Sequence, residues 1–161
     1  MGAIVEAREF RNALGRFPTS VAVVVARDDD GTLVGLTVNS VAPVAIDPPR
    51  LAWSLGVRSR SRAVFESAPF FAVNVLKDDQ LELAQRMAAA VPDRFAGLAW
   101  RESSASRLPF FDGCVARFDC WRTATLELGD HVMFLGDIID FETEDGAPLL
   151  YYQGRYAQLR G

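Results

Sequence analysis

The chain has 161 residues, of which 50% are hydrophobic, 24% charged and 11% aromatic, so we expect one compact domain spanning residues 1–161 with a substantial core. Twenty-one acidic residues against seventeen basic ones give a net charge of -4, which argues against nucleic acid as a partner. The longest apolar runs are much shorter than the roughly 18 residues that indicate a membrane span. The sequence therefore predicts a soluble protein that binds neither nucleic acid nor membrane.

Residues Met1–Phe10 contain acidic side chains and arginine where a secretory signal would have a basic start and an apolar stretch, which predicts a cytoplasmic location. The two cysteines, Cys114 and Cys120, fall on one predicted strand, and six residues of strand separate them by roughly 20 Å. Because a disulfide needs Cα atoms within roughly 7 Å, we expect two buried, reduced thiols.

Periodicity and turn residues divide the first half of the chain into helices and strands. Apolar residues spaced by three and four from Phe10 to Phe17 predict an amphipathic helix. The run from Val21 to Ala26 is apolar at both odd and even positions, which point to opposite faces of a strand. This predicts a strand covered on both faces, either by helices or by a second subunit. In chain order we predict a helix over 6–17, strands over 21–27 and 32–39 around a turn at 28–31, a strand over 51–55, a helix over 59–67, a strand over 70–76 and a helix over 78–90 that Pro92 ends.

The second half of the chain is predicted to form mostly strands. From Cys114 to Leu128 apolar and polar residues alternate, so Cys120, Leu126 and Leu128 are expected to face the core while Arg117 and Asp119 face water. Further strands are predicted over 131–141, again apolar on both parities, and, after a turn at 144–148, over 149–159. Because helices do not alternate regularly with strands, the predicted fold class is mainly β with flanking helices, antiparallel and closed into a barrel.

The residues available for chemistry are few. A single histidine and two separated cysteines lack the spacing of zinc or iron–sulfur sites, so metal catalysis is not expected. No Gly-x-Ser-x-Gly elbow, Walker loop or Gly-x-Gly-x-x-Gly loop occurs either. An enzyme with this composition would take its chemistry from a bound organic cofactor.

The first candidate stretch for such a cofactor closes the strand predicted over 32–39. The stretch consists of Gly35, Leu36, Thr37, Val38, Asn39 and Ser40, and it ends that strand with hydroxyl and amide groups, which offer donors and acceptors to a flat heteroaromatic ligand. A capped turn without a ligand accounts for the same residues.

The second candidate stretch begins the predicted helix over 59–67. Arg58, Ser59, Ser61 and Arg62 bring guanidinium and hydroxyl groups to that helix start, a combination that suits a phosphate monoester. A solvated helix start is the alternative interpretation.

The third candidate group combines Gly129, Asp130 and His131, at the start of a predicted strand, with Gly154, Arg155 and Tyr156 near the C-terminus. Imidazole and guanidinium groups suit the pyrophosphate or amide of a dinucleotide, and the tyrosine ring suits stacking on a base. A purely structural histidine is the alternative.

Taken in order, several short motifs resemble the flavin reductase family, whose members include the reductase components of two-component flavin monooxygenases. They are Phe-Pro-Thr at 17–19, Gly-Leu-Thr-Val-Asn-Ser at 35–40, Asp-Pro-Pro at 47–49, Arg-Ser-Arg-Ser at 58–61, Phe-Ala-Val-Asn-Val-Leu at 71–76, Asp-Arg-Phe-Ala-Gly at 93–97, Gly-Asp-His at 129–131, Leu-Gly-Asp at 135–137 and Pro-Leu-Leu-Tyr-Tyr-Gln-Gly-Arg-Tyr at 148–156. The resemblance extends from Phe10 to Leu159.

The resemblance implies an FMN-binding split β-barrel, usually a homodimer, that reduces FMN or FAD with NADH or NADPH for a partner monooxygenase. It places the isoalloxazine and ribityl chain along Thr37, Val38, Asn39 and Ser40, with Ser54 and Leu55 lining the pocket, Ser59, Ser61 and nearby Arg58 and Arg62 on the flavin phosphate, Phe95 closing over the flavin, and His131, Gly154, Arg155 and Tyr156 beside the nicotinamide nucleotide. His131 would orient that nucleotide as a catalytic residue.

Three positions depart from the family pattern: Ser20, Arg50 and Arg62. The additional arginine at 62 would tighten flavin binding, which keeps open the alternative of a flavin-binding protein with tightly held FMN and no free-flavin reductase activity. A barrel-shaped interaction domain without flavin is the third possibility.

Overall fold

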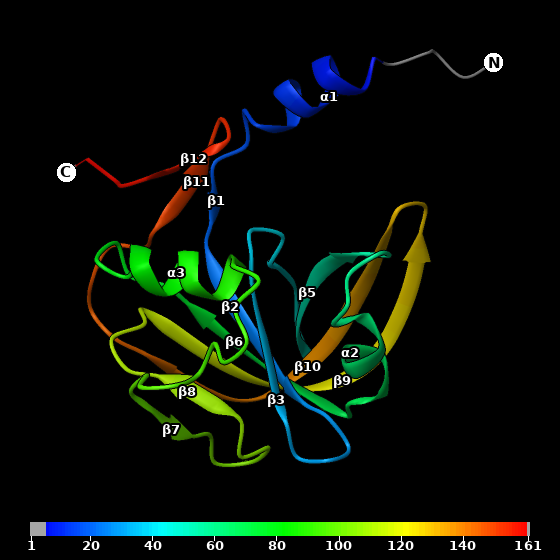
Figure 1. Ribbon diagram of the computed structural model, residues 1–161, viewed down its shortest axis with the longest axis vertical. Coiled ribbons are helices and arrows are strands. Elements are labelled where there is room, and N and C mark those ends of the chain that lie inside the picture. The colour runs from blue at the N-terminus through cyan, green and yellow to red at the C-terminus, as the bar shows by residue number, and fades with distance from the viewer. Residues whose placement is uncertain (1–5, 161) are drawn as a thin grey trace.

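The computed structural model describes residues 6–160 and is drawn in Figure 1. Residues 1–5, which carry part of the prediction about a secretory signal, lie outside the described residues, as does residue 161. The helices are α1 (Ala7–Leu14), α2 (Arg62–Ser67) and α3 (Leu81–Ala88). The strands are β1 (Thr19–Ser20), β2 (Ala22–Arg27), β3 (Leu33–Val38), β4 (Ala42–Ile46), β5 (Pro49–Gly56), β6 (Phe70–Val75), β7 (Trp100–Glu102), β8 (Pro109–Phe111), β9 (Ala116–Leu128), β10 (His131–Thr143), β11 (Leu150–Tyr152) and β12 (Arg155–Ala157).

Seven strands form one antiparallel sheet in the order β3-β2-β6-β9-β10-β5-β4. The chain runs directly from β3, at one edge of this sheet, into β4, at the other edge. The sheet curls into a barrel (Figure 1), with α3 packed against β3 and with Phe65 of α2 in the core inside the barrel. Two small sheets, β1-β11-β12 and β7-β8, complete the fold. The predicted mainly-β antiparallel architecture with flanking helices is confirmed.

Strand β2 is buried on both faces, as its sequence predicts. Val24 belongs to the core inside the barrel, where Trp53 stacks on Phe134. Val23 belongs to a second cluster, outside the barrel, which includes Ala84 of α3. A covering helix therefore accounts for the two-sided apolarity of this strand.

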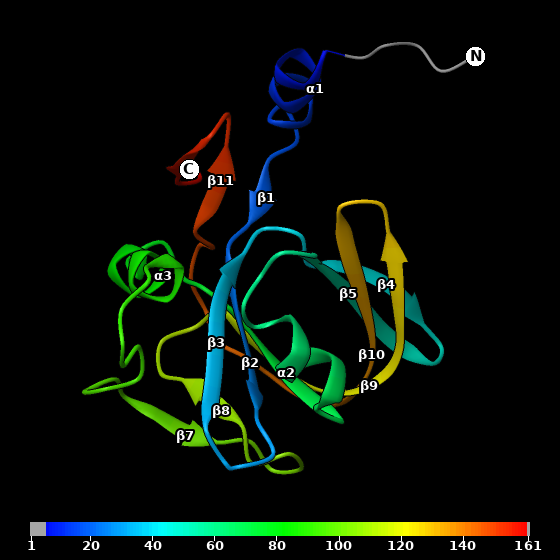
Figure 2. The same ribbon diagram turned by 45° about the vertical axis from the view of Figure 1, so that its right-hand side comes forward.

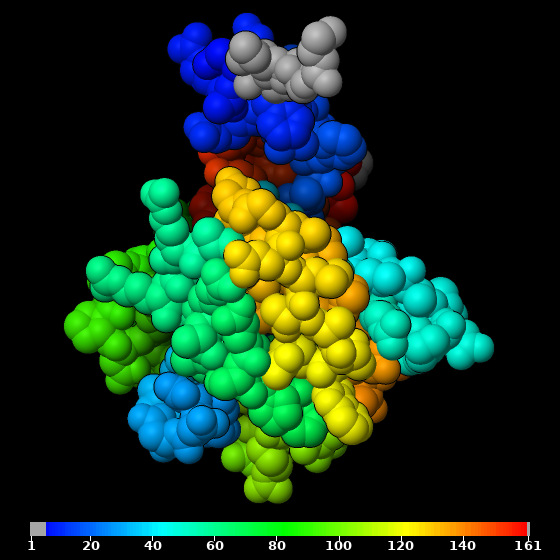
Figure 3. Space-filling model, turned by 90° about the vertical axis from the view of Figure 1, so that its right-hand side faces the viewer, coloured from blue at the N-terminus to red at the C-terminus, as the bar shows by residue number. Residues whose placement is uncertain are grey.

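Strand β10 shows the same apolarity but a different environment. Val132 and Phe134 are buried inside the barrel, whereas the intervening Met133 and Leu135 are half-buried and His131 is exposed on the outer face. Figure 3 views the molecule from the side on which the β9–β10 hairpin runs along the surface. The outer face of this hairpin thus keeps part of its apolar area in contact with solvent.

A β-bulge interrupts the predicted alternation of β9. The pairing with β10 shifts by one residue at Thr123, and one extra residue moves every later side chain to the opposite face. Cys120 is therefore buried in the core, but Leu126 and Leu128 are 44% and 53% exposed. The prediction that these two leucines share the core face with Cys120 is wrong.

Two residues of the predicted polar face of β9 are buried instead of facing water. Arg117 is 1% exposed and Asp119 is fully buried, because the segment that carries β7 and β8 lies over them. Arg117 Nε donates to the carbonyl oxygen of Phe111 at 2.6 Å, and an Asp119 carboxylate oxygen accepts from the Ser106 amide at 2.9 Å. The predicted water contact is therefore wrong for these residues, and the covering hairpin had not been predicted.

Helix α1 projects from the barrel (Figure 2). The Glu6 carboxylate caps it by accepting from two backbone N–H groups of its first turn. The predicted apolar stripe forms, but Phe10 and Leu14 are 53% and 49% exposed and no residue of α1 is buried. Within residues 6–160 this stripe has no partner surface.

Two further segments differ from their predictions. β4 is absent from the predicted elements; it contains Pro43 and lies at an edge of the seven-stranded sheet, where proline is tolerated. The closing segment is a hairpin rather than one strand, because Gln153 and Gly154 adopt positive φ angles of 49° and 78° between β11 and β12. Over residues 6–160, no helix has the length and apolar character needed to cross a membrane.

Candidate functional site

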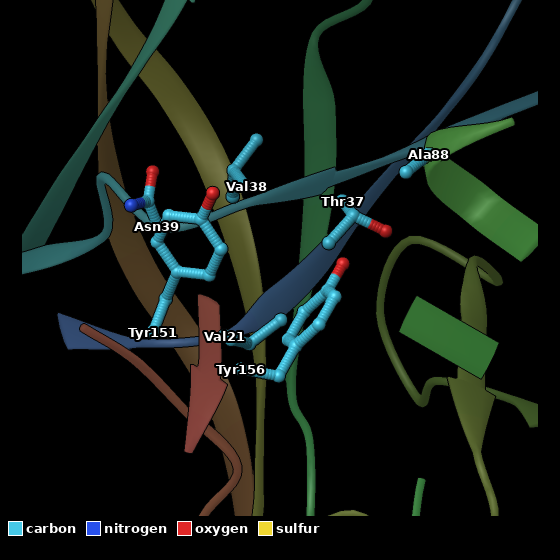
Figure 4. Close-up of a pocket in the computed structure, with 7 residues that line it drawn as sticks. All are labelled: Val21, Thr37, Val38, Asn39, Ala88, Tyr151 and Tyr156. Atoms are coloured by element: carbon cyan, nitrogen blue, oxygen red, sulfur yellow. The ribbon is translucent and has the colours of Figure 1, made fainter. Parts of the chain in front are cut away.

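The largest share of the predicted flavin-facing residues lies around one cavity of about 200 Å³, which we call the tyrosine cavity (Figure 4). It is lined by Val21, Thr37, Val38, Asn39, Ala88, Tyr151 and Tyr156. The end of β3 forms one side, and the two tyrosine rings rise toward it from the β11–β12 hairpin. The sequence had predicted that Thr37, Val38, Asn39 and Tyr156 belong to binding stretches, and the fold brings these four together.

Thr37 and Tyr156 supply hydroxyl groups to the tyrosine cavity, and the two differ in their hydrogen bonding. The Thr37 hydroxyl donates to the carbonyl oxygen of Ala84 in α3 at 2.6 Å, which leaves its oxygen as an acceptor. The rings of Tyr151 and Tyr156 meet edge to face at 5.5 Å between centroids. Burial, and then the neighbouring Tyr151, raise the pKa of Tyr156, so its hydroxyl stays protonated and can donate a hydrogen bond.

A second cavity, of about 490 Å³, lies further along the same strand and is called the loop cavity. It is lined by Thr32, Leu33, Val34, Gly35, Ser61, Val91, Pro92, Asp93, Arg94 and Phe95. Its walls are β3, the start of α2 and the irregular segment after α3. Of the predicted residues, Ser61 and Phe95 line this cavity. Gly35 of β3 also lines it and lies two residues before Thr37 of the tyrosine cavity.

The third cavity, of about 650 Å³, lies at the tip of the β9–β10 hairpin and is called the histidine cavity. It is lined by Gly56, Val57, Arg58, Gly129, Asp130 and His131. His131 Nδ1 is 2.8 Å from an Asp130 carboxylate oxygen, and this hydrogen bond lowers the pKa of Asp130. His131 and Tyr156, predicted to border the same nucleotide, line different cavities.

Ser40 and Ser54 form a bridge between the chain after β3 and strand β5. The Ser40 hydroxyl donates to the Ser54 carbonyl oxygen at 3.0 Å and accepts from the Ser54 amide at 2.9 Å. Leu55, the next residue of β5, is buried in the barrel core. The serine pair thus fixes the end of the strand that carries Asn39, and Leu55 contributes to the core.

The predicted phosphate-binding group does not gather at one point. Ser61 lines the loop cavity, Arg58 lines the histidine cavity, and the Ser59 hydroxyl accepts from the Ser61 amide at 3.3 Å. Arg62 pairs with the carboxylates of Glu66 and Glu127, each at 2.8 Å. The charge of Arg62 is therefore already balanced within the chain.

The turn of the β11–β12 hairpin contains the remaining predicted residues. Gly154 occupies its left-handed position, with φ of 78°, and Arg155 is exposed at the start of β12. Neither residue lines the tyrosine cavity, in contrast to the adjacent Tyr156.

Several residues that line these cavities are absent from the predicted binding set, among them Tyr151 and Arg94. Gly35 belongs to the first candidate stretch, and a glycine inside a strand often marks the close approach of another group. Tyr151 belongs to the quoted motif at 148–156 and lines the tyrosine cavity. Arg94 lies in the loop cavity and donates to the Gly35 carbonyl oxygen at 2.8 Å, a contact between residues far apart in sequence that no local pattern indicates.

Residues 14–160 match the family model described as "Flavin reductase like domain". This chain belongs to the flavin reductase family. It is 38% identical over 94% of its length to a flavin reductase of Pseudomonas putida and to the FMN reductase (NADH) SmoA of Agrobacterium fabrum, of which it covers 89% and 86%. It is also 38% identical, over 97% of its length, to the reductase component of the flavin-dependent trigonelline monooxygenase of Acinetobacter baylyi, and spans half the length of that relative.

Solved structures of flavin reductases share the fold. The NADH:FAD oxidoreductase SgcE6 of Streptomyces globisporus, solved with NAD and FAD fragments, superposes with a TM-score of 0.90 at 28% identity, covering 99% of this chain and 98% of that chain. Flavin reductase PheA2 gives a TM-score of 0.89 at 28% identity, covering 98% and 100%. The predicted split barrel of the flavin reductase family is therefore confirmed.

The cavities along β3 match a flavin in their chemistry. The tyrosine cavity presents apolar walls, two aromatic rings and a few polar atoms, the usual lining for a heteroaromatic ring. The loop cavity adds the Ser61 hydroxyl and the Arg94 guanidinium, groups that bind a phosphate ester. Because both cavities border β3, an elongated ligand along this strand would reach both sets of groups.

Proposed function

We propose that this protein is an NAD(P)H-dependent flavin reductase that transfers hydride from NADH or NADPH to FMN or FAD and supplies the reduced flavin to a partner monooxygenase. The observation that carries the proposal is the tyrosine cavity, in which residues from the predicted flavin-binding motif face two tyrosine rings, together with the loop cavity beside it along β3. The proposal treats residues 1–161 as one reductase domain acting in the cytoplasm, in keeping with its free, buried cysteines.

The residues of the tyrosine cavity would bind and orient the flavin ring. Val21 and Val38 provide apolar surface, the Asn39 amide offers both a donor and an acceptor, and Tyr156 offers a protonated hydroxyl. When bound, a flavin accepts hydride from a reduced nicotinamide. This transfer needs no protein acid or base, so alignment of the two rings in a site that excludes water would supply most of the rate.

The charged groups would hold the phosphates of the two ligands. Ser61 and Arg94 in the loop cavity suit the flavin phosphate. Arg58 and His131 share the histidine cavity, so we assign Arg58 to the nicotinamide nucleotide rather than to the flavin. In this assignment His131 orients the nucleotide and Asp130 orients the imidazole through their 2.8 Å contact.

The geometry of Arg62 favours exchangeable flavin over the alternative of tightly held FMN. That alternative depended on an additional guanidinium group for the flavin phosphate. Arg62 pairs instead with Glu66 and Glu127, so its charge is balanced without a ligand. This supports a flavin that binds as a substrate and leaves.

The proposal predicts that the purified protein oxidises NADH or NADPH in air at a rate that rises and saturates with added FMN or FAD. Absorbance at the reduced-nicotinamide band measures the rate, and gel filtration after mixing measures how much flavin stays bound. A yellow protein whose rate ignores added flavin would support tightly held FMN. A protein that neither quenches flavin fluorescence nor oxidises nicotinamide would leave only the interaction domain.

We further propose that the protein acts as a homodimer. Two exposed apolar surfaces support this: the α1 stripe with Phe10 and Leu14, and strand β9, which exposes Leu126, Leu128 and Trp121, the last at 59%. Apolar area of this extent on a single chain is typical of an interface. A second copy of the chain would cover it.

A further inference from the structure

The segment between α3 and β7 is irregular chain, but one arginine and one aspartate organise it. Arg86 of α3 donates through Nε to the carbonyl oxygen of Arg94 at 2.8 Å, and through Nη2 to those of Asp93, at 3.4 Å, and Ala96. The Asp93 carboxylate accepts from the amides of Phe95, at 3.2 Å, and Ala96, at 3.0 Å. The polar backbone groups at the turn of this loop are thus bound by Arg86, which lies outside the loop, and by Asp93, which lies within it.

The same loop is attached to the edge of the barrel. Arg94 Nη1 donates to the carbonyl oxygen of Gly35 at 2.8 Å, on the side of β3 that has no neighbouring strand. The Phe95 ring lies so close to Gly35 that a Cβ atom there would be 2.8 Å from Phe95 Cζ and 3.3 Å from Met87 Sδ. Only glycine at this position lets the ring rest against the strand.

The far side of the Phe95 ring has a rigid support. Phe111 stacks on it, with ring centroids 6.1 Å apart and planes 18° apart. The amide of Phe111 donates to the Asn74 side-chain oxygen at 2.9 Å, and its carbonyl oxygen accepts from Arg117 Nε at 2.6 Å. Asn74 and Arg117 are 0% and 1% exposed, so both backbone groups of Phe111 are fixed by buried side chains.

From these contacts we infer that Arg86 and Phe111 are positioning residues that hold Phe95 as a fixed wall of the loop cavity, formed before any flavin enters. Phe95 is then a preformed surface rather than a lid that closes on the ligand. Preorganisation of this kind improves affinity because binding does not have to order the loop. The inference rests on the proposed function, since the flavin is the ligand that this wall would meet.

Hydrogen exchange of the flavin-free protein tests the inference directly. We expect the amides of Phe95 and Ala96 to exchange slowly without ligand, because both donate to Asp93, and to gain little protection when FMN is added. Exchange at the rate of an unstructured chain, followed by strong protection with FMN, would show a closing lid and overturn the inference. This measurement needs no variant.

A substitution of the organising arginine tests its positioning role. In Arg86→Gln the loop should be in its binding-competent form only part of the time, and a tenfold fall in that fraction raises the apparent Kd for flavin about tenfold. We expect the same rise in the KM for flavin, with kcat within about twofold of the unchanged protein, and faster exchange at Ala96. Lysine should not restore affinity, because it cannot present the guanidinium geometry that reaches three carbonyl groups.

The matched control is Arg122→Gln, which removes an arginine of β9 that likewise donates to a backbone carbonyl oxygen, that of Ala68, and whose other hydrogen bond goes to Thr125, also outside the loop. It should leave the Kd for flavin unchanged. Gly35→Ala is the second variant, because its Cβ displaces Phe95 without altering Arg86, and it should also weaken flavin binding. An unchanged Kd in both Arg86→Gln and Gly35→Ala would overturn the inference, whereas failure of the unchanged protein to bind flavin would overturn the proposed function.

Discussion

At the scale of single residues, His131 is the side chain whose role is most open to test. It is exposed at the tip of the β9–β10 hairpin and contacts Asp130, also exposed, so its removal should not alter the core. We predict that His131→Ala lowers kcat/KM for NADH about tenfold, the loss expected for one hydrogen bond to a charged group. Steady-state kinetics with NADH as the varied substrate measures this, and thermal unfolding should show an unchanged Tm.

Asp130→Asn provides the control for that change. It keeps the size of the side chain but removes the carboxylate that contacts the imidazole. If Asp130 only orients His131, the loss of kcat/KM should be smaller than in His131→Ala. An unaltered rate in His131→Ala would remove the histidine from the nucleotide site.

The residues of the site were predictable to different degrees, for physical reasons. Thr37, Val38 and Asn39 follow one another along a strand, so a local motif contains the whole wall that they form. Arg94 and Gly35 meet only because the loop after α3 folds back on β3, and such a contact has no local sequence pattern. Residues contributed by separate elements therefore appear only in the folded chain.

At the scale of secondary-structure elements, the crossing of β10 over the core depends on a glycine. A Cβ atom at Gly136 would lie 2.5 Å from Phe71 Cζ and 3.0 Å from Cys120 Cβ. We predict that Gly136→Ala lowers the free energy of unfolding by about 1–3 kcal/mol, the usual cost of overpacking a core. Chemical denaturation measures the change.

Gly56→Ala is the matched control for this prediction. Gly56 also lies in a strand of the sheet, but a Cβ atom there would meet nothing within 4 Å. Its free energy of unfolding should stay within about 0.5 kcal/mol of the unchanged protein. Equal effects of the two substitutions would mean that the loss of stability comes from the changed backbone flexibility and not from a steric clash of the added Cβ atom.

The strands also show where alternation fails as a predictor. The pattern from Cys114 to Leu128 is regular in sequence, but the bulge at Thr123 reverses the faces beyond it. The buried Asp119 looked like a solvent-facing residue because the hairpin that supplies its partner, Ser106, comes from a segment without a clear strand pattern. The long strands of the main sheet were thus readable from local composition, whereas β4, the β7–β8 hairpin and the covering of each face depended on tertiary contacts.

At the scale of the whole molecule, the exposed apolar surfaces predict the oligomeric state. Placing a carboxylate in a covered interface costs several kcal/mol, so Leu126→Glu should raise the dissociation constant of the dimer about a hundredfold or more. Sedimentation velocity over a range of concentrations measures this. Within one chain Leu126 is 44% exposed, so the variant should fold normally.

Leu159→Glu serves as the control, because Leu159 is exposed to a similar degree, at 58%, beyond β12 and away from the β9–β10 hairpin. It should leave the dissociation constant unchanged. A protein that sediments as a monomer at all concentrations without any substitution would contradict the proposed homodimer.

Three sulfur atoms, those of Cys114, Cys120 and Met87, lie in the core, where the proposed chemistry leaves them unharmed. Reduced flavin that reacts with molecular oxygen before it reaches a monooxygenase yields oxidised flavin and hydrogen peroxide. Hydrogen peroxide oxidises a cysteine when the cysteine is in its thiolate form. Burial raises the pKa of Cys114 to about 12 and that of Cys120 as well, and the thioether of Met87 is also fully buried. A reductase of this build can generate an oxidant at its own surface and keep these three side chains in their reduced form.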